Sequence, residues 1–160
     1  MIYYIFKEQI FTIFLSMAHL TAMTFPAKVF DYVGGQEGDF KIYELNKRKS
    51  LVIEAKRKDI NRNFIVFEKN GKYHFNIKYD ETLSNKDIVL MEAKSCGLYS
   101  IIEETKKYQL FECPKSLLIV NKSREKLKVN DFYLSKKKFI SKGPPVWVDE
   151  KLVYYKGRAL

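Results

Sequence analysis

The sequence predicts an all-β fold, a β-sandwich or small barrel built mostly of antiparallel hairpins, and two observations carry that prediction. Short apolar or alternating stretches follow one another at close spacing, separated by turn residues, which is typical of sandwiches and barrels. No stretch beyond the N-terminal residues keeps the 3.6-residue period of a helix over a useful length. The 160-residue chain is 46% hydrophobic, which is enough apolar material for one packed domain.

The strongest hairpin signal lies at residues 63–80, which read NFIVFEKNGKYHFNIKYD. Asn70-Gly71 at its centre suits a type I′ turn, because both central residues of that turn need a positive φ. Folding the chain about this pair places Phe64 opposite Ile77, Val66 opposite Phe75, and Glu68 opposite Tyr73. One face of the pair is then apolar, as in a strand pair with one side in the core. We therefore expect a core hairpin whose buried residues are Phe64, Val66, Tyr73, Phe75 and Ile77.

The first 22 residues are predicted to form a helical export signal. Residues 10–23, IFTIFLSMAHLTAM, are apolar with only small or weakly polar breaks. This run is shorter and more interrupted than a membrane span requires, and it fits a secretory signal peptide better. Cleavage after Ala18 or Ala22 would each leave a small residue last. A retained membrane anchor is the alternative.

Residues 28–160 are predicted to form a single β-domain that ends in a hairpin over residues 144–157. Residues 88–93 fit either a strand or a short helix. The other expected strands, each with an apolar or alternating pattern, cover residues 29–33, 40–45, 51–55, 117–120, 126–129, 131–134, 146–148 and 152–155.

The two cysteines bracket a second symmetric stretch, CGLYSIIEETKKYQLFEC. A hairpin that turns between Glu104 and Thr105 would place Cys96 opposite Cys113, Tyr99 opposite Leu110 and Ile101 opposite Tyr108. Export implies an oxidising compartment, where an even cysteine count favours pairing. We therefore expect a Cys96–Cys113 disulfide; the alternative is two unpaired cysteines that pack as small apolar side chains.

Catalytic chemistry is not visible in the sequence, and we expect no enzyme, cofactor or metal site. The only histidines are His19, within the predicted signal, and His74, in the middle of a predicted strand. One remaining histidine cannot build a multi-histidine metal site, and its position argues against a Ser-His-Asp catalyst. The Gly34-Gly35 turn is followed by Gln36-Glu37-Gly38, which is too acidic and too short for a phosphate loop.

The formal net charge of +10, from 29 basic and 19 acidic residues, bears on partners and not on the fold. Anionic lipid, nucleic acid and acidic protein surfaces are candidate partners, and lysines on solvated faces are the alternative explanation. Lysines next to aromatics, such as Lys72-Tyr73 and Lys107-Tyr108, suit single-stranded nucleic acid. The export signal argues against that role, so no nucleic-acid binding is expected of the chain by itself.

Three segments between residues 51 and 77 follow a recognisable order: the strand LVIEAK at 51–56, NFIVF at 63–67 and YHFNI at 73–77. In this order they resemble the N-terminal β-domain of the CagX/TrbG-type proteins, periplasmic ring subunits of type IV secretion and conjugation channels. A second similarity joins PPVWVD at 144–149 to LVYY at 152–155. Family members usually carry a further C-terminal domain that binds a lipoprotein partner, so the resemblance implies a single-domain or shortened relative.

The resemblance implies a structural component of such a channel, located in the periplasm, associated with the outer membrane or cell envelope, and peripheral to the membrane. Its partners would be other channel subunits, including itself in a ring, and it would act by protein–protein contact. The alternative function is a periplasmic binding module that uses its positive face for an anionic ligand or partner.

Overall fold

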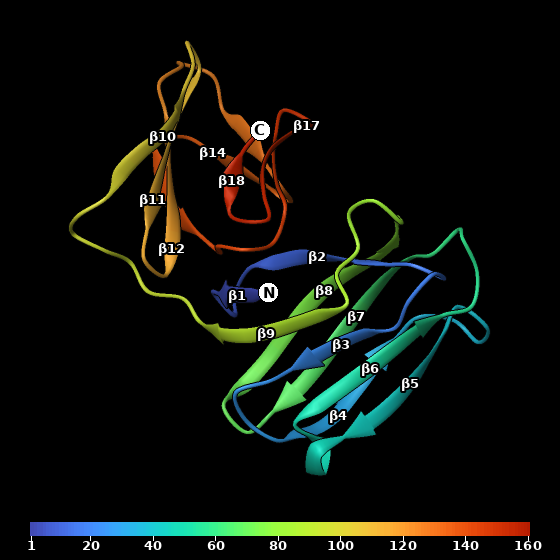
Figure 1. Cartoon of the computed structure of the whole chain (residues 1–160). Coiled ribbons are helices and arrows are strands. Elements are labelled where there is room, and N and C mark those ends of the chain that lie inside the picture. Colours follow the sequence, from blue (N-terminus) through green and yellow to red (C-terminus); the bar gives the residue numbers. More distant parts are fainter. The chain divides into compact units, whose positions relative to one another are not determined.

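The computed structural model describes residues 1–160, and the predicted all-β class is confirmed (Figure 1). One short 3₁₀ turn, η1 (Asn46–Arg48), interrupts the strands. The strands are β1 (Ile2–Ile5), β2 (Ile10–Leu15), β3 (Thr21–Thr24), β4 (Val29–Gly34), β5 (Phe40–Leu45), β6 (Ser50–Ala55), β7 (Asn61–Glu68), β8 (Gly71–Tyr79), β9 (Asp87–Glu92), β10 (Ser100–Glu104), β11 (Tyr108–Cys113), β12 (Ser116–Asn121), β13 (Leu127–Val129), β14 (Phe132–Leu134), β15 (Lys137–Ile140), β16 (Val146–Val148), β17 (Lys151–Tyr155) and β18 (Arg158–Ala159).

The chain divides into two compact units. Unit 1 comprises Met1–Tyr3 and Ile10–Met91, and unit 2 comprises Tyr4–Gln9 and Glu92–Leu160. The backbone therefore passes from one unit to the other three times, and neither unit is a single continuous segment. The predicted domain over residues 28–160 contains residues of both.

Unit 1 contains two sheets, with strand orders β1-β9-β3-β6-β5 and β2-β8-β7-β4. The pairings of β2 with β8 and of β3 with β9 are parallel, whereas those of β3 with β6, β4 with β7, β5 with β6 and β7 with β8 are antiparallel. The core is aromatic, because the ring of Phe75 lies 4.6 Å from that of Phe11 and 6.2 Å from that of Phe64. Phe40 of one sheet meets Phe64 of the other, with ring centroids 5.8 Å apart.

Unit 2 also contains two sheets, here called sheet C (β10-β11-β12-β15) and sheet D (β14-β13-β16-β17-β18). Their buried residues form one hydrophobic cluster, consisting of Tyr108, Leu110, Leu117, Ile119, Leu127, Val129, Leu134, Ile140, Val146, Val148, Val153 and Tyr154. In the hairpin of β16 and β17, Asp149 and Glu150 make the turn with φ values of 47° and 68°. Positive φ at both central residues is the type I′ requirement.

The central hairpin forms between β7 and β8, but its predicted register is wrong by two residues. Phe64 lies opposite Phe75, Val66 opposite Tyr73, and Glu68 opposite Gly71. The turn is made by Lys69 and Asn70, one position earlier than predicted. A shift of two residues keeps every side chain on its face, so the five predicted core residues are all buried: Phe64, Val66, Tyr73, Phe75 and Ile77. The buried Glu68 carboxylate accepts hydrogen bonds from Ala27 N and Tyr73 Oη, which holds the end of β7 on the core side.

The expected N-terminal helix is wrong, because the residues assigned to it form β1, β2 and the first part of β3. Phe11, Ile13 and Leu15 alternate into the core of unit 1. The run from Ile10 to Phe14 consists of β-branched and aromatic residues, which favour strands when a pairing partner is available. That partner is β8, which pairs with all six residues of β2. Removal of residues 1–22 as a signal stays a prediction.

The N-terminal run thus forms strands. No helix in the structure has both the length and the apolar character needed to cross a membrane.

Candidate functional site

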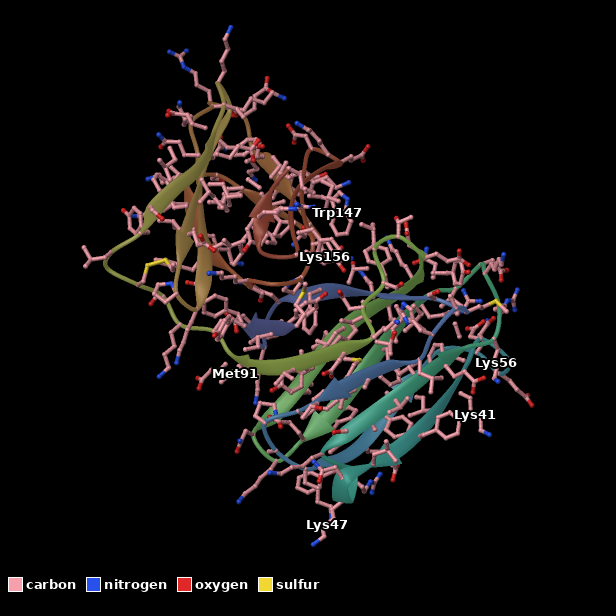
Figure 2. The ribbon with its side chains drawn as sticks, in the orientation of Figure 1. Lys41, Lys47, Lys56, Met91, Trp147 and Lys156 are labelled. Atoms are coloured by element: carbon pink, nitrogen blue, oxygen red, sulfur yellow. A yellow bond between two sulfur atoms is a disulfide. The ribbon has the colours of Figure 1, made fainter.

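A disulfide joins Cys96 to Cys113, which confirms the predicted pairing (Figure 2). Their sulfur atoms are 2.05 Å apart and their Cα atoms 6.0 Å apart. Cys113 is the buried last residue of β11, whereas Cys96 lies in the connection between β9 and β10. The bond therefore fastens an irregular connection to the end of sheet C.

The hairpin register that led to this pairing is wrong. Ser100 lies opposite Glu112 and Glu103 opposite Leu110, with an irregularity between Ile101 and Glu103. The turn falls over residues 105–108 because Thr105 fixes it: its backbone N–H donates to Tyr108 O, and its Oγ1 accepts from the N–H groups of Lys107 and Tyr108. Cys96 thus reaches Cys113 from outside the strand pair.

Backbone and side-chain hydrogen bonds hold the same connection in place. Ser116, which is fully buried, donates from Oγ to Lys94 O at 2.7 Å, and Lys94 N donates to Lys115 O. Lys142 Nζ donates to Cys113 O at 2.9 Å and forms an ion pair of 2.7 Å with Glu112. The bonds of Lys94 and the disulfide of Cys96 therefore hold the start of the connection against the end of sheet C.

The connection and the start of β10 present apolar side chains to solvent. Leu98 is 90% exposed, and Tyr99 and Ile101 are also exposed. Tyr99 leans edge-on against Phe111, with ring centroids 5.0 Å apart. Beside them lies a hollow of about 510 Å³, lined by Leu98, Tyr99, Ser100, Glu112, Cys113, Pro114 and Lys142. We call Leu98, Tyr99, Ile101 and Pro114 the disulfide surface.

The disulfide surface lies on an open sheet edge. β10 is the first strand in the order of sheet C and pairs only with β11. The backbone groups on the outer side of an edge strand are free to pair with a strand of another chain. Apolar side chains next to such an edge add specificity to the backbone hydrogen bonds of an incoming strand.

Unit 1 brings together a serine and a histidine that the sequence did not connect. His19 Nε2 lies 3.0 Å from Ser84 Oγ, and His19 Nδ1 lies 3.3 Å from Leu20 O. With the proton on Nδ1, Nε2 accepts from the serine, which is the arrangement of a nucleophile and its base. However, Ser84 is buried and also reaches Glu81 O at 3.1 Å, and no carboxylate bonds His19. The pair therefore ties the loop at residues 80–85 to the β2–β3 connection.

The same histidine borders a hollow of about 370 Å³. Its charged lining residues are already paired, since Glu54 accepts from Tyr43 Oη at 2.6 Å and from Lys56 Nζ at 2.5 Å. These hydrogen bonds lower the pKa of Glu54, with the bond from Lys56 as the larger cause. His74 lies elsewhere, on β8, with Ile65 and Ile10 as its cross-strand neighbours. The charged side chains beside this hollow thus bond one another.

A carboxylate of the chain itself occupies the Gly34–Gly38 turn. Asp39 is fully buried, and its Oδ2 accepts from Gln36 N at 2.8 Å and from Arg62 Nε at 2.9 Å. The carboxylate therefore fills the position that an anion would take at these donors. A side chain is excluded at Gly34, where a Cβ would lie 2.2 Å from Asn63 O.

Comparisons with known proteins add no identity: no family model matches the chain, and no curated protein matches it. No group of three or more His, Cys, Asp or Glu side chains is arranged to hold a metal ion. The disulfide surface is the candidate functional site. The cysteines that hold it were predictable from their even count and spacing. Leu98 carried no signal, because one leucine beside a glycine is typical of an ordinary loop.

Proposed function

We propose that this chain is a non-enzymatic subunit that acts by protein–protein contact, with a strand of another subunit docking at the disulfide surface. The observation that carries the proposal is the exposure of Leu98 and Tyr99, on a connection that the disulfide holds, and of Ile101, on the open edge strand β10 that follows it. A flexible loop would lose its freedom on binding, and pre-ordering it reduces that cost.

The disulfide supports an oxidising compartment as the place of action, since such bonds persist there and are rare in the cytosol. The proposed location is the periplasm, at the outer membrane or cell envelope. In its most specific form, the proposal is a structural subunit of a type IV secretion or conjugation channel. The resemblance over residues 51–77 supports that form. The proposal includes a β-sandwich arrangement of the two sheets of unit 1.

The alternative function is a periplasmic binding module for an anionic ligand. Affinity purification after mild cross-linking of envelope fractions separates the two. The wild-type chain is expected in a large membrane-associated assembly, and N-terminal sequencing of the same material shows whether residues 1–22 are removed. A freely soluble periplasmic monomer would favour the binding module, and a cytoplasmic location would exclude both functions.

A matched pair of variants assigns the contact to the surface. Leu98→Asp with Tyr99→Asp is expected to leave the chain folded and release it from the assembly. Val33→Asp with Leu45→Asp, which alters exposed apolar residues of unit 1, is expected to leave assembly intact. If both double variants assemble like the wild type, the disulfide surface is not the docking site.

A further inference from the structure

Basic residues are concentrated in unit 2. It holds 16 of the 29 Lys and Arg residues but only 9 of the 19 Asp and Glu residues, which is a formal +7 of the chain's +10. Several of these cations lie close together, at the end of sheet C opposite to the disulfide. We call this set the basic corner: Lys106, Arg124, Lys126, Lys136, Lys137 and Lys138.

Asn121 holds the basic corner together. Its side-chain Nδ2 donates to Glu125 O at 2.7 Å and to Leu134 O at 2.9 Å, and its backbone N donates to Lys136 O at 2.6 Å. Its Oδ1 accepts from both the N–H and the hydroxyl of Ser123, at 2.9 Å each. One side chain thus fixes the turn at residues 122–126 against the entry to β15.

The hairpin tip of β10 and β11 joins the same end. Lys122 N donates to Lys107 O at 2.8 Å, and Lys122 Nζ donates to Thr105 O and to Glu104, the latter at 2.6 Å. Three turns or strand ends that are distant in sequence, at residues 104–108, 122–126 and 134–138, are therefore neighbours. Figure 1 shows the tip of the β10–β11 hairpin beside the orange turn that follows β12.

The cations of the basic corner are free of acidic partners. The ion pairs of unit 2 involve other lysines: Lys107, Lys122, Lys128 and Lys142. None of the six corner residues has a carboxylate within ion-pairing distance, and Lys138 instead lies 4.3 Å from the centre of the Phe132 ring. Lysines on an edge strand such as β15 also prevent aggregation. That explanation covers Lys137 and Lys138 but not Lys106, Arg124 and Lys126.

One aromatic side chain accompanies the cations. Tyr133 of β14 is 68% exposed and directly precedes Leu134, whose carbonyl is bonded to Asn121. Single-stranded nucleic acid needs successive aromatic rings along a basic groove, and Tyr133 is the only exposed large aromatic at this end of unit 2. A cluster of four to eight cations with an interfacial tyrosine is instead typical of proteins that bind anionic lipid headgroups.

We infer that the basic corner binds the surface of an anionic membrane through lipid phosphate groups. This inference does not depend on the proposed protein contact, because the two surfaces lie at opposite ends of sheet C. Turn-borne cations contact a layer of headgroups without a pocket, and Tyr133 enters the interface between headgroups and acyl chains.

The test is co-sedimentation with vesicles that contain phosphatidylglycerol, compared with vesicles of phosphatidylcholine alone. The wild type is expected to bind only the anionic vesicles, and raising the ionic strength is expected to weaken binding because salt screens exposed charges. The variant Arg124→Glu, Lys136→Glu and Lys137→Glu should bind at least about 100-fold more weakly, because the loss of three attractive charges at about 1 kcal/mol each already gives that factor.

The matched control reverses three exposed lysines of unit 1 whose side chains have no ion-pair partner: Lys58→Glu, Lys69→Glu and Lys86→Glu. Both triple variants have the same net charge, so the control should retain most of the binding if the corner is the site. The inference would be overturned if both triple variants lost vesicle binding equally. It would also be overturned if raising the ionic strength left wild-type binding unchanged. Tighter binding to a single-stranded oligonucleotide than to the anionic vesicles would also overturn it, and would assign the corner to nucleic acid.

Discussion

Ile13 of β2 lies beside Ile77 of β8 in a parallel strand pair, and neither side chain is accessible to solvent. The first of these residues belongs to the segment that the sequence assigns to an export signal. The pairing therefore makes the N-terminal segment part of the core of unit 1, and the consequence can be tested by removing it.

Deletion of residues 1–22 is expected to abolish cooperative folding of unit 1. Phe11, Ile13 and Leu15 are buried there, and burial of three such side chains contributes roughly 5–9 kcal/mol. That is comparable to the whole free energy of unfolding of a typical domain, about 5–15 kcal/mol. Urea unfolding followed by near-UV circular dichroism measures the effect. A shortened chain that unfolds cooperatively like the full one would favour the cleaved signal over the strands.

Phe75→Ala is expected to lower the free energy of unfolding by about 3–5 kcal/mol. Phe75 is buried and in ring contact with Phe11, Phe25, Phe64 and Tyr73, so its loss leaves a cavity that several rings line. Phe30→Ala, which truncates an exposed ring on β4, should change stability by no more than about 0.5 kcal/mol. Equal urea midpoints for the two variants would show that the aromatic cluster is not the core.

Tyr154→Phe and Tyr108→Phe are expected to change stability in opposite directions. The Tyr154 hydroxyl is buried and has no hydrogen-bond partner, so its removal should stabilise the chain by about 1–3 kcal/mol. The Tyr108 hydroxyl donates to Glu103 Oε1 at 2.8 Å, and loss of a bond to a charged group should cost about 1.5–3 kcal/mol. Both rings belong to the same cluster, so each variant controls for the other. Destabilisation by Tyr154→Phe would contradict the unpaired hydroxyl.

Stability is expected to fall at alkaline pH. Burial, together with the nearby Glu112, raises the pKa of Tyr154 to about 12, and burial and the bond to Glu103 also raise the pKa of Tyr108. Both residues ionise more easily in the unfolded chain, at a pKa of about 10. Below pH 10 both residues are neutral in either state and do not alter stability, whereas stability falls as the pH rises from 10 toward the folded values, because the unfolded chain releases these protons first. Urea midpoints measured from pH 8 upward should decline more steeply for the wild type than for Tyr154→Phe.

The unfolded, unreduced protein is expected to contain no free thiol, and two free thiols per chain would contradict the disulfide. Reduction should lower the free energy of unfolding by about 3 kcal/mol, because the bond restricts the unfolded chain. The double variant Cys96→Ser with Cys113→Ser should match the reduced wild type. Under the proposed function, reduction also frees the connection that carries Leu98, so partner binding should weaken with it.

Strand positions after residue 28 were largely predictable, because alternation and turn residues there reflect local preferences. Residues 88–93 were predicted to form either a strand or a short helix, and the structure has the strand β9 there. The register of the central hairpin was not predictable to the residue, since Glu68 binds Ala27, which is 41 positions away in sequence. The N-terminal strands were missed for a similar reason: β2 needs β8 as a parallel partner, and an apolar run without that partner is typical of a signal.

The candidate surfaces were likewise predictable only where the signal lay in local sequence. Cysteine count and spacing predicted which residues pair, although the path between them was wrong. The basic corner could not be read from the sequence, because Arg124 and Lys136 come together only through the hydrogen bonds of Asn121. The lysine run at residues 136–138 is interpreted from the sequence as solvated surface, because its neighbours come from two other turns that are distant in sequence.

Gln9 sits in unit 2, where its side chain accepts from Ser141 N, 132 positions further along, and donates to Phe139 O. A ribosome adding about 5–20 residues per second needs roughly 7–26 s to make that stretch. During this interval the Gln9 side chain lacks its partners at Phe139 and Ser141, so unit 2 is incomplete. Until those residues have been made, the segments of unit 2 remain open to proteases and can be drawn through a translocation pore.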